Sequence, residues 1–147
     1  MSEKRIIGRK EFASFPEFEL KQIDVKIDTG AFTSSIHCYH IEEKNLNDKK
    51  VLFFKLLDPK HKHYNNQIFF TENYRQKIIR SSTGHASKRY IIKTQIELFD
   101  QLYPIELSLS ERKSMKYPVL IGRKLLNGKF IVDTSKINLT RSLKKKK

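Results

Sequence analysis

Short runs rich in β-branched and aromatic residues constrain the fold of this chain more than any other feature. In the run 21–27, Ile23, Val25 and Ile27 alternate with polar residues, which is the period-2 pattern of a half-buried strand. Further runs of this kind occupy 51–57, 67–70, 89–99, 102–109, 119–121 and 130–132. Turn residues separate several of them, namely Asn47-Asp48, Asp58-Pro59, Asn65-Asn66 and Asp100-Gln101. This pattern predicts an all-β fold, built as a mostly antiparallel sandwich or barrel.

One short segment, 123–126, is the helix that we expect. Asn127-Gly128 follows it directly, which is typical of a helix C-terminus. The chain has 147 residues, the length of one ordinary domain, and neither a repeat nor a flexible linker divides it. We therefore expect a single domain over 1–140 and a disordered basic tail over 141–147, which contains Lys144 to Lys147.

The composition excludes several classes of protein. Apolar residues make up 38% of the chain, which argues against wholesale disorder. No stretch approaches the ~18 consecutive apolar residues of a membrane-spanning helix, and no apolar region of a secretory signal follows the charged N-terminus. A single cysteine, Cys38, excludes an intramolecular disulfide framework and is typical of a reducing compartment. We expect a cytoplasmic protein with no membrane partner.

The charge is strong and unevenly placed. The formal net charge is +14, and residues 74–147 hold eighteen basic and five acidic side chains. Such an excess attracts an anionic partner, either nucleic acid or an acidic peptide. The tyrosines Tyr74, Tyr90, Tyr103 and Tyr117 would suit a basic β-domain that binds nucleic acid without catalysis, but they fit strand cores equally well. No nucleic-acid-binding signature is present, so this remains the alternative hypothesis.

The segment 25–31 carries the most chemical information. An apolar strand runs directly into Asp28, which is followed by Thr29 and Gly30. An acid at the end of a buried strand is costly unless it is hydrogen-bonded or used in function. Thr29 can hold a hydrogen bond beneath the carboxylate, and Gly30 lets the backbone or a substrate approach closely. An ordinary strand-to-turn boundary would also explain Asp and Gly at these positions.

A second segment favours the functional interpretation. In 119–126 an apolar strand ends at Gly122, and Arg123 opens the short helix. Together, the Asp-Thr-Gly-Ala loop and the later Ile-Gly-Arg segment resemble the retropepsin-like aspartic proteases. The resemblance implies a retropepsin-like acid-protease barrel with one short C-terminal helix that packs beneath the catalytic loop.

The resemblance narrows to one subgroup. The blocks 26–37, 80–84 with 89–92, 109–123 and 132–133 look like the bacterial and archaeal family named ATP-dependent zinc proteases, which is often associated with ATP-grasp peptide ligases. The similarity extends over roughly residues 6 to 137. It implies an aspartic endopeptidase with a possible functional link to an ATP-grasp ligase, although a non-catalytic, peptide-binding relative would share the fold.

The resemblance also assigns roles to residues. Asp28 would be the catalytic acid, in a loop with Thr29 and Gly30. Because an aspartic protease needs two carboxylates that share one proton, a chain with one Asp-Thr-Gly would form a homodimer and donate Asp28 from each subunit. Gly122 and Arg123 would support the loop. Phe32 and Thr33 stand where retroviral proteases place acids, so Arg123 needs another partner, for which Asp133 is a candidate.

The expected substrate is a peptide or protein, and an acidic peptide is the narrower hypothesis. Ala31 and Thr33 take substrate-binding positions of the loop, and Arg80 and Arg89 lie in the resembling blocks. Arginine suits bidentate recognition of carboxylates, so we consider an oligoglutamate tail added by an ATP-grasp ligase. The turn Ser81–Gly84 is a candidate for the tip of a hairpin over the site.

We expect no cofactor. His37 is a weak candidate for a metal ligand, together with Asp28, and the pairs Cys38–His40 and His61–His63 have strand spacing for chelation, but neither His-Glu-x-x-His nor Cys-x-x-Cys occurs. The segment 122–129 differs from a P-loop in its glycine spacing and in having Phe130 after Lys129, so we expect no ATP bound by this chain. Cys38 is interpreted as a buried thiol rather than a nucleophile.

Overall fold

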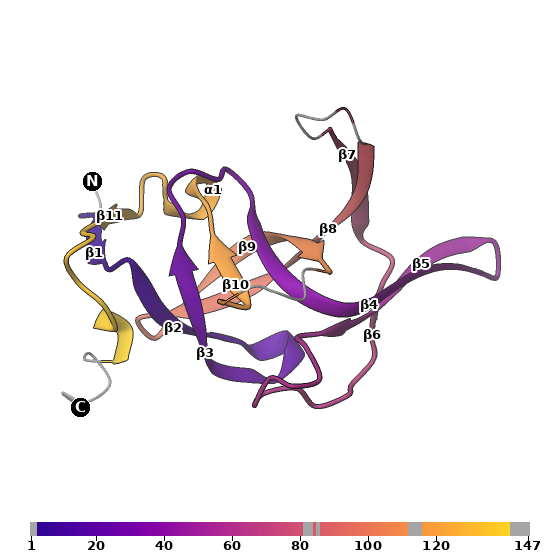
Figure 1. The fold of residues 1–147 in the computed structure, drawn as a ribbon, viewed down its shortest axis with the longest axis horizontal. Coiled ribbons are helices and arrows are strands. Elements are labelled where there is room, and N and C mark those ends of the chain that lie inside the picture. Colours follow the sequence, from indigo (N-terminus) through magenta and orange to yellow (C-terminus); the bar gives the residue numbers. More distant parts are fainter. Residues whose placement is uncertain (1–2, 81–83, 85, 112–115, 142–147) are drawn as a thin grey trace.

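The computed structural model describes residues 3–80, 84, 86–111 and 116–141, without the side chains of 79, 80 and 87. Eleven strands, one 3₁₀ turn and one α-helix follow one another within this part of the chain (Figure 1). In order they are β1 (Arg5–Ile7), β2 (Lys10–Phe15), η1 (Pro16–Phe18), β3 (Leu20–Ile27), β4 (Ser34–Leu46), β5 (Lys49–Leu56), β6 (Phe69–Thr71), β7 (Tyr74–Arg80), β8 (Ala86–Leu98), β9 (Gln101–Ser110), β10 (Val119–Ile121), α1 (Arg123–Leu126) and β11 (Phe130–Val132).

Six strands close into a barrel in the order β10-β3-β2-β8-β9-β4. The short strand β10 closes the ring, because it pairs in parallel with β3 and antiparallel with β4. This confirms the predicted fold class, a mostly β barrel with one short helix near the C-terminus. A separate two-stranded sheet joins the ends of the domain, since β1 pairs in parallel with β11.

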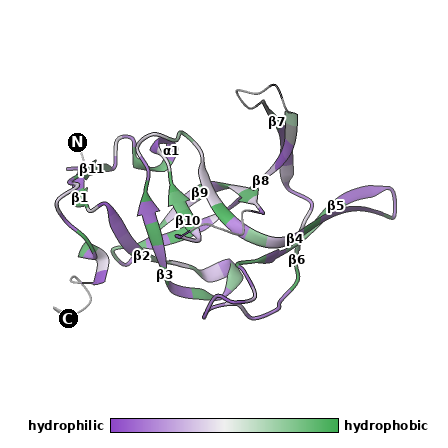
Figure 2. Cartoon of the chain, viewed as in Figure 1, coloured by the Kyte–Doolittle hydropathy of each residue, from purple (hydrophilic) through white to green (hydrophobic). Residues whose placement is uncertain are grey.

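The interior of the barrel is apolar. The alternation predicted for 21–27 is confirmed, because Ile23, Val25 and Ile27 of β3 are all buried. The same alternation of hydrophobic and hydrophilic residues is visible along several other barrel strands (Figure 2). Leu125 and Leu126 of α1 join this core, so burial of its apolar side holds the helix against the barrel.

Two hairpins extend the barrel. The outer part of β4 pairs with β5 and, together with β6, projects away from the body (Figure 1). Asn47 and Asp48 both have positive φ, at 51° and 65°, which is the two-residue hairpin turn expected there. The second hairpin pairs β7 with β8 from Tyr74–Ile92 to Arg80–Ala86. Its predicted turn at Ser81–Gly84 lies largely outside the described residues.

Several elements differ from the sequence prediction. Strands β1, β2, β4 and β7 were not among the predicted runs. The β8–β9 turn is formed by Phe99 and Asp100, one residue earlier than expected, because Leu98 pairs with Gln101. Arg141, which the prediction assigned to the tail, places its guanidinium over the ring of Phe12 at 3.6 Å. The rest of that tail, 142–147, lies outside the described residues. No helix in the described part of the chain is long and apolar enough to cross a membrane.

Candidate active site

Asp28 stands where β3 leaves the barrel. Its backbone N–H donates to the carbonyl oxygen of Ile121 at 2.8 Å, which continues the pairing of β3 with β10 by one residue. The N–H of Gly30 donates to Oδ1 of Asp28 at 3.0 Å, and the N–H of Ala31 donates to its carbonyl oxygen at 3.3 Å. A Cβ at position 30 would lie 3.2 Å from Oδ1, so glycine leaves room for the carboxylate. The loop itself therefore orients Asp28.

The helix α1 holds this loop from the other side. Gly122 donates its N–H to Oγ of Ser34 at 2.9 Å, and the N–H groups of Arg123 and Lys124 donate to the carbonyl oxygens of Ala31 and Phe32 at 2.8 and 2.9 Å. The first N–H groups of a helix have no partner within it, so the loop supplies the missing acceptors. A Cβ at Gly122 would lie 2.6 Å from the carbonyl oxygen of Phe32. The two sequence blocks are thus in direct contact, and the contact requires glycine.

Arg123 supports the loop through its side chain as well. Its Nη1 donates to the carbonyl oxygen of Thr29 at 2.8 Å, and its guanidinium lies 5.9 Å from the centre of the exposed Phe32 ring. Thr29 thus contributes its carbonyl oxygen to the loop. Within the described residues, its hydroxyl does not form the hydrogen bond that we expected beneath the Asp28 carboxylate. Thr29 and Gly30 are exposed.

Asp133 does not support the loop of Asp28 in the expected way. Its Oδ1 accepts hydrogen bonds from the hydroxyl and the N–H of Ser135, at 2.6 and 3.0 Å, and these bonds lower the pKa of Asp133. Its backbone N–H donates to Ile7 beside the β1–β11 sheet. The suggestion that Asp133 is the partner of Arg123 was therefore wrong, because a local turn uses its carboxylate.

A pocket of about 230 Å³ opens beside Asp28. Of the predicted site residues, Ala31, Thr33 and Arg89 line it together with Asp28. Sequence reasoning missed the others, which are Ser35, Lys77, Ile91, Ser108, Ser110 and Leu120. They come from five strands, and cross-strand register is what places them together. The side chain of the other predicted arginine, Arg80, lies outside the described part.

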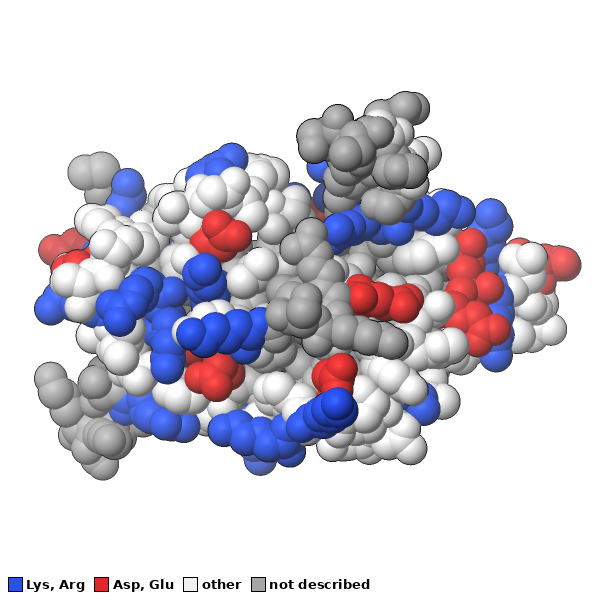
Figure 3. Space-filling view, viewed as in Figure 1, with Lys and Arg blue, Asp and Glu red and all other residues white. Residues whose placement is uncertain are grey.

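The charge of the pocket is positive. Lys77 and Arg89 are directly opposite each other on β7 and β8, and both line it, whereas Asp28 is the one acid among its described lining residues. Basic side chains gather where the β7–β8 hairpin meets the barrel (Figure 3). Two cations on one face of the sheet attract an anionic ligand.

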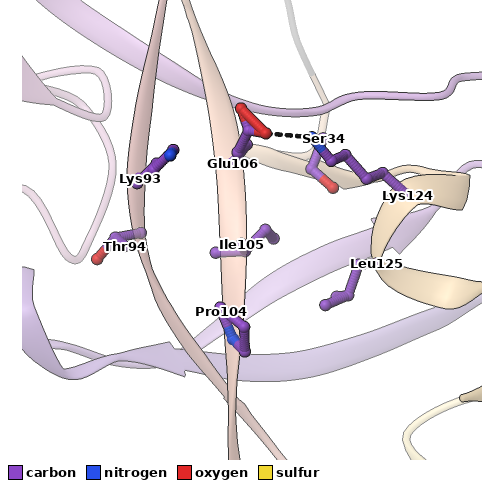
Figure 4. Close-up of a pocket in the computed structure, with 8 residues that line it drawn as sticks. All are labelled: Ser34, Lys93, Thr94, Pro104, Ile105, Glu106, Lys124 and Leu125. Carbon is purple, nitrogen blue, oxygen red and sulfur yellow. Dashed lines mark hydrogen bonds and ion pairs between the residues drawn. The ribbon is translucent and has the colours of Figure 1, made fainter. Parts of the chain in front are cut away.

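A second hollow of about 310 Å³ lies between α1 and the edge of β9 (Figure 4). Pro104, Ile105 and Leu125 are among its lining residues. Glu106 forms ion pairs with Lys124 of α1 and with Arg75 of β7, the latter at 3.0 Å. Lys124 first, and then Arg75, hold the pKa of Glu106 below its usual range. This network ties α1 to the sheet, and it makes Arg75 part of an ion pair.

Of the candidate metal ligands, His61 and His63 lie side by side, with ring centres 5.5 Å apart, whereas His37 makes other contacts. His37 is buried, its Nδ1 is 3.1 Å from the carbonyl oxygen of Ser110, and its Nε2 lies 3.9 Å from Oδ2 of Asp58. Among the described residues there is no group of three or more His, Cys, Asp or Glu side chains that could hold a metal ion. Burial raises the pKa of the Cys38 thiol, so a reactive thiolate is disfavoured.

Three of the four tyrosines weighed for nucleic-acid binding are used in packing. Tyr74, Tyr90 and Tyr103 pack against the core, and the rings of Tyr74 and Tyr90 are 5.9 Å apart in an edge-on arrangement. Tyr74 also donates its hydroxyl to Glu43; burial first, and then this bond, raise the pKa of Tyr74 to about 12. These three rings therefore do not form a free stacking surface.

Comparison with known proteins identifies one family for this chain. Residues 6–142 match the RimB-like family, described as retropepsin-like aspartic endopeptidase RimB. A probable alpha-L-glutamate ligase of Shewanella halifaxensis is 34% identical over 136 residues, which cover 90% of this chain and 29% of the ligase. The corresponding protein of Parasynechococcus marenigrum is 31% identical over 137 residues, or 90% and 28% of the two chains. This chain thus spans less than a third of these relatives.

A solved structure has the same fold. The crystal structure of Lpg0085 from Legionella pneumophila, described as a protein of unknown function, superposes with a TM-score of 0.75. The two sequences are 26% identical, and the match covers 94% of this chain and 99% of Lpg0085. The agreement over nearly both whole chains includes the barrel that carries Asp28.

Proposed function

This chain belongs to the RimB-like family of retropepsin-like aspartic endopeptidases, and we propose that it hydrolyses peptide bonds with a water molecule activated by Asp28. One observation carries the proposal. Asp28 is fixed by its own loop and by α1, and it lines a pocket next to two cations. If these residues formed only a strand-to-turn boundary, neither the buried hydrogen bond of Gly122 nor the pocket would be expected.

The mechanism needs a second carboxylate. One Asp28 acts as general base on the water while its protonated partner donates a hydrogen bond to the scissile carbonyl, because two carboxylates at such a distance cannot both ionise. We propose that the second Asp28 comes from another copy of the chain across a two-fold axis. The exposure of Thr29 and Gly30 supports this, because it leaves the loop accessible to a partner subunit.

We further propose that the substrate is an acidic peptide. Lys77 and Arg89 form one basic row of the sheet face, and Ile91, two residues beyond Arg89, lines both this pocket and a smaller hollow beside Arg75 and Lys93. Positions two apart on a strand are about 7 Å apart, which is also the spacing of alternate side chains in an extended peptide. An acidic side chain in the pocket of Asp28 would therefore lie near Lys77 and Arg89, whereas Arg75 is already paired with Glu106, which lines the smaller hollow.

The relatives suggest the source of such a peptide. Those compared are named as probable alpha-L-glutamate ligases, and the similarity covers less than a third of their length. We propose a functional link between this chain and a glutamate ligase of the ATP-grasp type, with oligoglutamate tails as substrate. Any use of ATP belongs to that partner, and the proposed hydrolysis requires neither zinc nor ATP from this chain.

The test is cleavage of a synthetic peptide that ends in a hexaglutamate tail, followed by mass spectrometry from acidic to neutral pH. We expect cleavage by the wild-type chain, none by Asp28→Asn, and weaker cleavage by Arg89→Ala and Arg80→Ala. Sedimentation of the same samples should show a dimer. A folded wild-type chain that cleaves no acidic or neutral peptide would refute the peptidase proposal.

The alternative, a basic β-domain that binds nucleic acid, makes opposite predictions. Such binding would weaken steeply with added salt and would tolerate Asp28→Asn. The net charge of +14, and the basic side chains near the β7–β8 hairpin in Figure 3, justify one binding measurement with single-stranded oligonucleotides. Tight binding that is insensitive to Asp28→Asn, without peptide cleavage, would favour it.

A further inference from the structure

Ser108 lines the pocket beside Asp28 and carries a buried hydroxyl. The residue is only 7% exposed, and its Oγ has no hydrogen-bond partner in the described part of the chain. A buried hydroxyl without a partner is unfavourable, because it has lost its hydrogen bonds to water. A rotation of the side chain would turn this hydroxyl toward a group that enters the pocket and would give it a partner.

Strand register places Ser108 between other residues that line the pocket. It lies opposite Ser35 of β4 on one side and Ile91 of β8 on the other, and both of these residues line the pocket. Leu120 of β10 is in turn paired with Ser35 and extends the same row. Residues opposite each other on neighbouring strands share a face of the sheet. Ser108 is thus flanked on both sides by lining residues.

The adjacent row of the sheet supplies positive charge. Arg89 is two residues from Ile91 on β8, and Lys77 is opposite Arg89 on β7, so both lie about 7 Å further along the same face. A hydroxyl donor next to two cations favours an acceptor with negative charge. The volume of about 230 Å³ has room for several water molecules, and hence for one carboxylate-bearing side chain.

We propose that Ser108 determines specificity by donating a hydrogen bond to the carboxylate of an acidic substrate side chain, with Lys77 and Arg89 balancing its charge. The inference rests on the proposed function and refines it: the pocket is the subsite for a glutamate or aspartate next to the scissile bond. A neutral glutamine side chain of the same size gains less, because the bond to Ser108 is then not charge-assisted.

The first experiment measures binding without catalysis. The full chain with Asp28→Asn is titrated against fluorescein-labelled hexaglutamate and hexaglutamine at fixed ionic strength, and anisotropy is recorded. Adding Ser108→Ala should weaken binding of hexaglutamate about tenfold, as expected for one lost hydrogen bond to a charged group, and should weaken binding of hexaglutamine less. Equal weakening of both peptides, or no change for either, would overturn the inference.

Thr94→Val is a matched control. Thr94 also carries a buried Oγ1 without a hydrogen-bond partner among the described residues, but it borders the hollow beside α1 and not the pocket of Asp28. Both variants remove an unpaired buried hydroxyl, so both report the effect of desolvation on stability. Only Ser108→Ala should change the preference for hexaglutamate over hexaglutamine. A similar change in Thr94→Val would mean that the effect is structural.

Cleavage by the Asp28-containing chain separates this inference from the proposed function. If the wild-type chain cleaves the hexaglutamate-tailed peptide and Ser108→Ala keeps the same preference over the glutamine-tailed peptide, the subsite is refuted and the peptidase proposal stands. If no peptide is cleaved but the binding contrast depends on Ser108, the peptidase proposal fails and the carboxylate site stands.

Discussion

The guanidinium of Arg123 donates a hydrogen bond to the carbonyl oxygen of Thr29 at 2.8 Å, across 94 residues of sequence. This bond and the backbone bond from Arg123 to Ala31 hold the loop of Asp28 at two points. We expect Arg123→Ala to reduce kcat by at least about tenfold, because small displacements of a catalytic group are costly. The loss of unfolding free energy should be about 1 kcal/mol or less, since the side-chain bond is exposed.

Arg9→Ala provides the control for this prediction. Arg9 makes the same kind of exposed bond, from Nη1 to the carbonyl oxygen of Thr134 at 3.0 Å, outside the pocket. Urea unfolding should give similar losses for both variants, whereas only Arg123→Ala should lose activity. Equal kcat values in the two variants would contradict a positioning role for Arg123.

Gly122→Ala should damage both folding and activity. The added Cβ would lie 2.6 Å from the carbonyl oxygen of Phe32, a backbone atom that cannot move without the loop. Overpacking of this kind costs about 2 kcal/mol in unfolding free energy. Gly8→Ala is the comparison, because its Cβ would meet the carbonyl oxygen of Lys136 at 2.4 Å. Both should unfold at lower urea concentration, but the folded fraction of Gly8→Ala should keep its kcat.

The ion pairs of Glu106 predict a pH-dependent stability. Lys124 and Arg75 lower the pKa of Glu106 in the folded protein from its ordinary value of 4.5, so the folded state binds this proton more weakly than the unfolded chain does. The stabilisation is therefore complete above pH 4.5 and is lost as the pH falls through the folded pKa. Glu106→Gln should lower the unfolding free energy by about 1 kcal/mol at neutral pH.

Urea unfolding at several pH values checks this sign. The difference between wild type and Glu106→Gln should shrink on acidification and vanish once Glu106 is protonated in both states. The exposed Glu17 provides a control, because Glu17→Gln lies outside this network. A difference that grows toward acidic pH would contradict the assignment of Glu106 as an ionised partner.

The sequence predicted those parts of the site whose residues are close together in the chain. The strand 21–27 shows strict alternation, and the Asp-Thr-Gly loop and the Ile-Gly-Arg segment each lie in one short block, so both were found. Strand β2 was missed because it contains Glu11, which is fully buried and accepts hydrogen bonds from Gly8 and Thr140. A buried acid within a strand contradicts the apolar pattern unless its distant partner is known.

The pairing register of the strands explains most of the other residues that the sequence prediction missed or misassigned. Nothing in the sequence around Ser108 or Lys77 distinguishes these residues from ordinary strand positions, and they reach the pocket only because β9 and β7 pair in the observed register. Asp133 was misassigned for the opposite reason: a hydrogen bond to a residue two positions away outcompeted the long-range partner. Pairing between strands, and not local propensity, decides which polar side chains surround Asp28.

Cys38 should be irrelevant to catalysis. It is fully buried, and burial raises the pKa of its thiol, so the native protein contains little thiolate to react. We expect full peptidase activity after treatment with iodoacetamide and no modification of Cys38 by mass spectrometry until urea is added. Cys38→Ala should keep its activity and lose about 1 kcal/mol of stability. Inactivation of the folded protein by the reagent would favour a cysteine nucleophile instead.

Lys77 should contribute to the affinity for acidic peptides through charge. It lines the pocket with Asp28 and lies opposite Arg89, so Lys77→Gln should raise KM for the hexaglutamate-tailed peptide several-fold and leave kcat nearly unchanged. The dependence of kcat/KM on salt should become shallower, because one cation fewer is screened. Lys60→Gln, in the exposed turn after Asp58, should change neither quantity. An unchanged salt dependence in Lys77→Gln would show that the acidic substrate binds elsewhere.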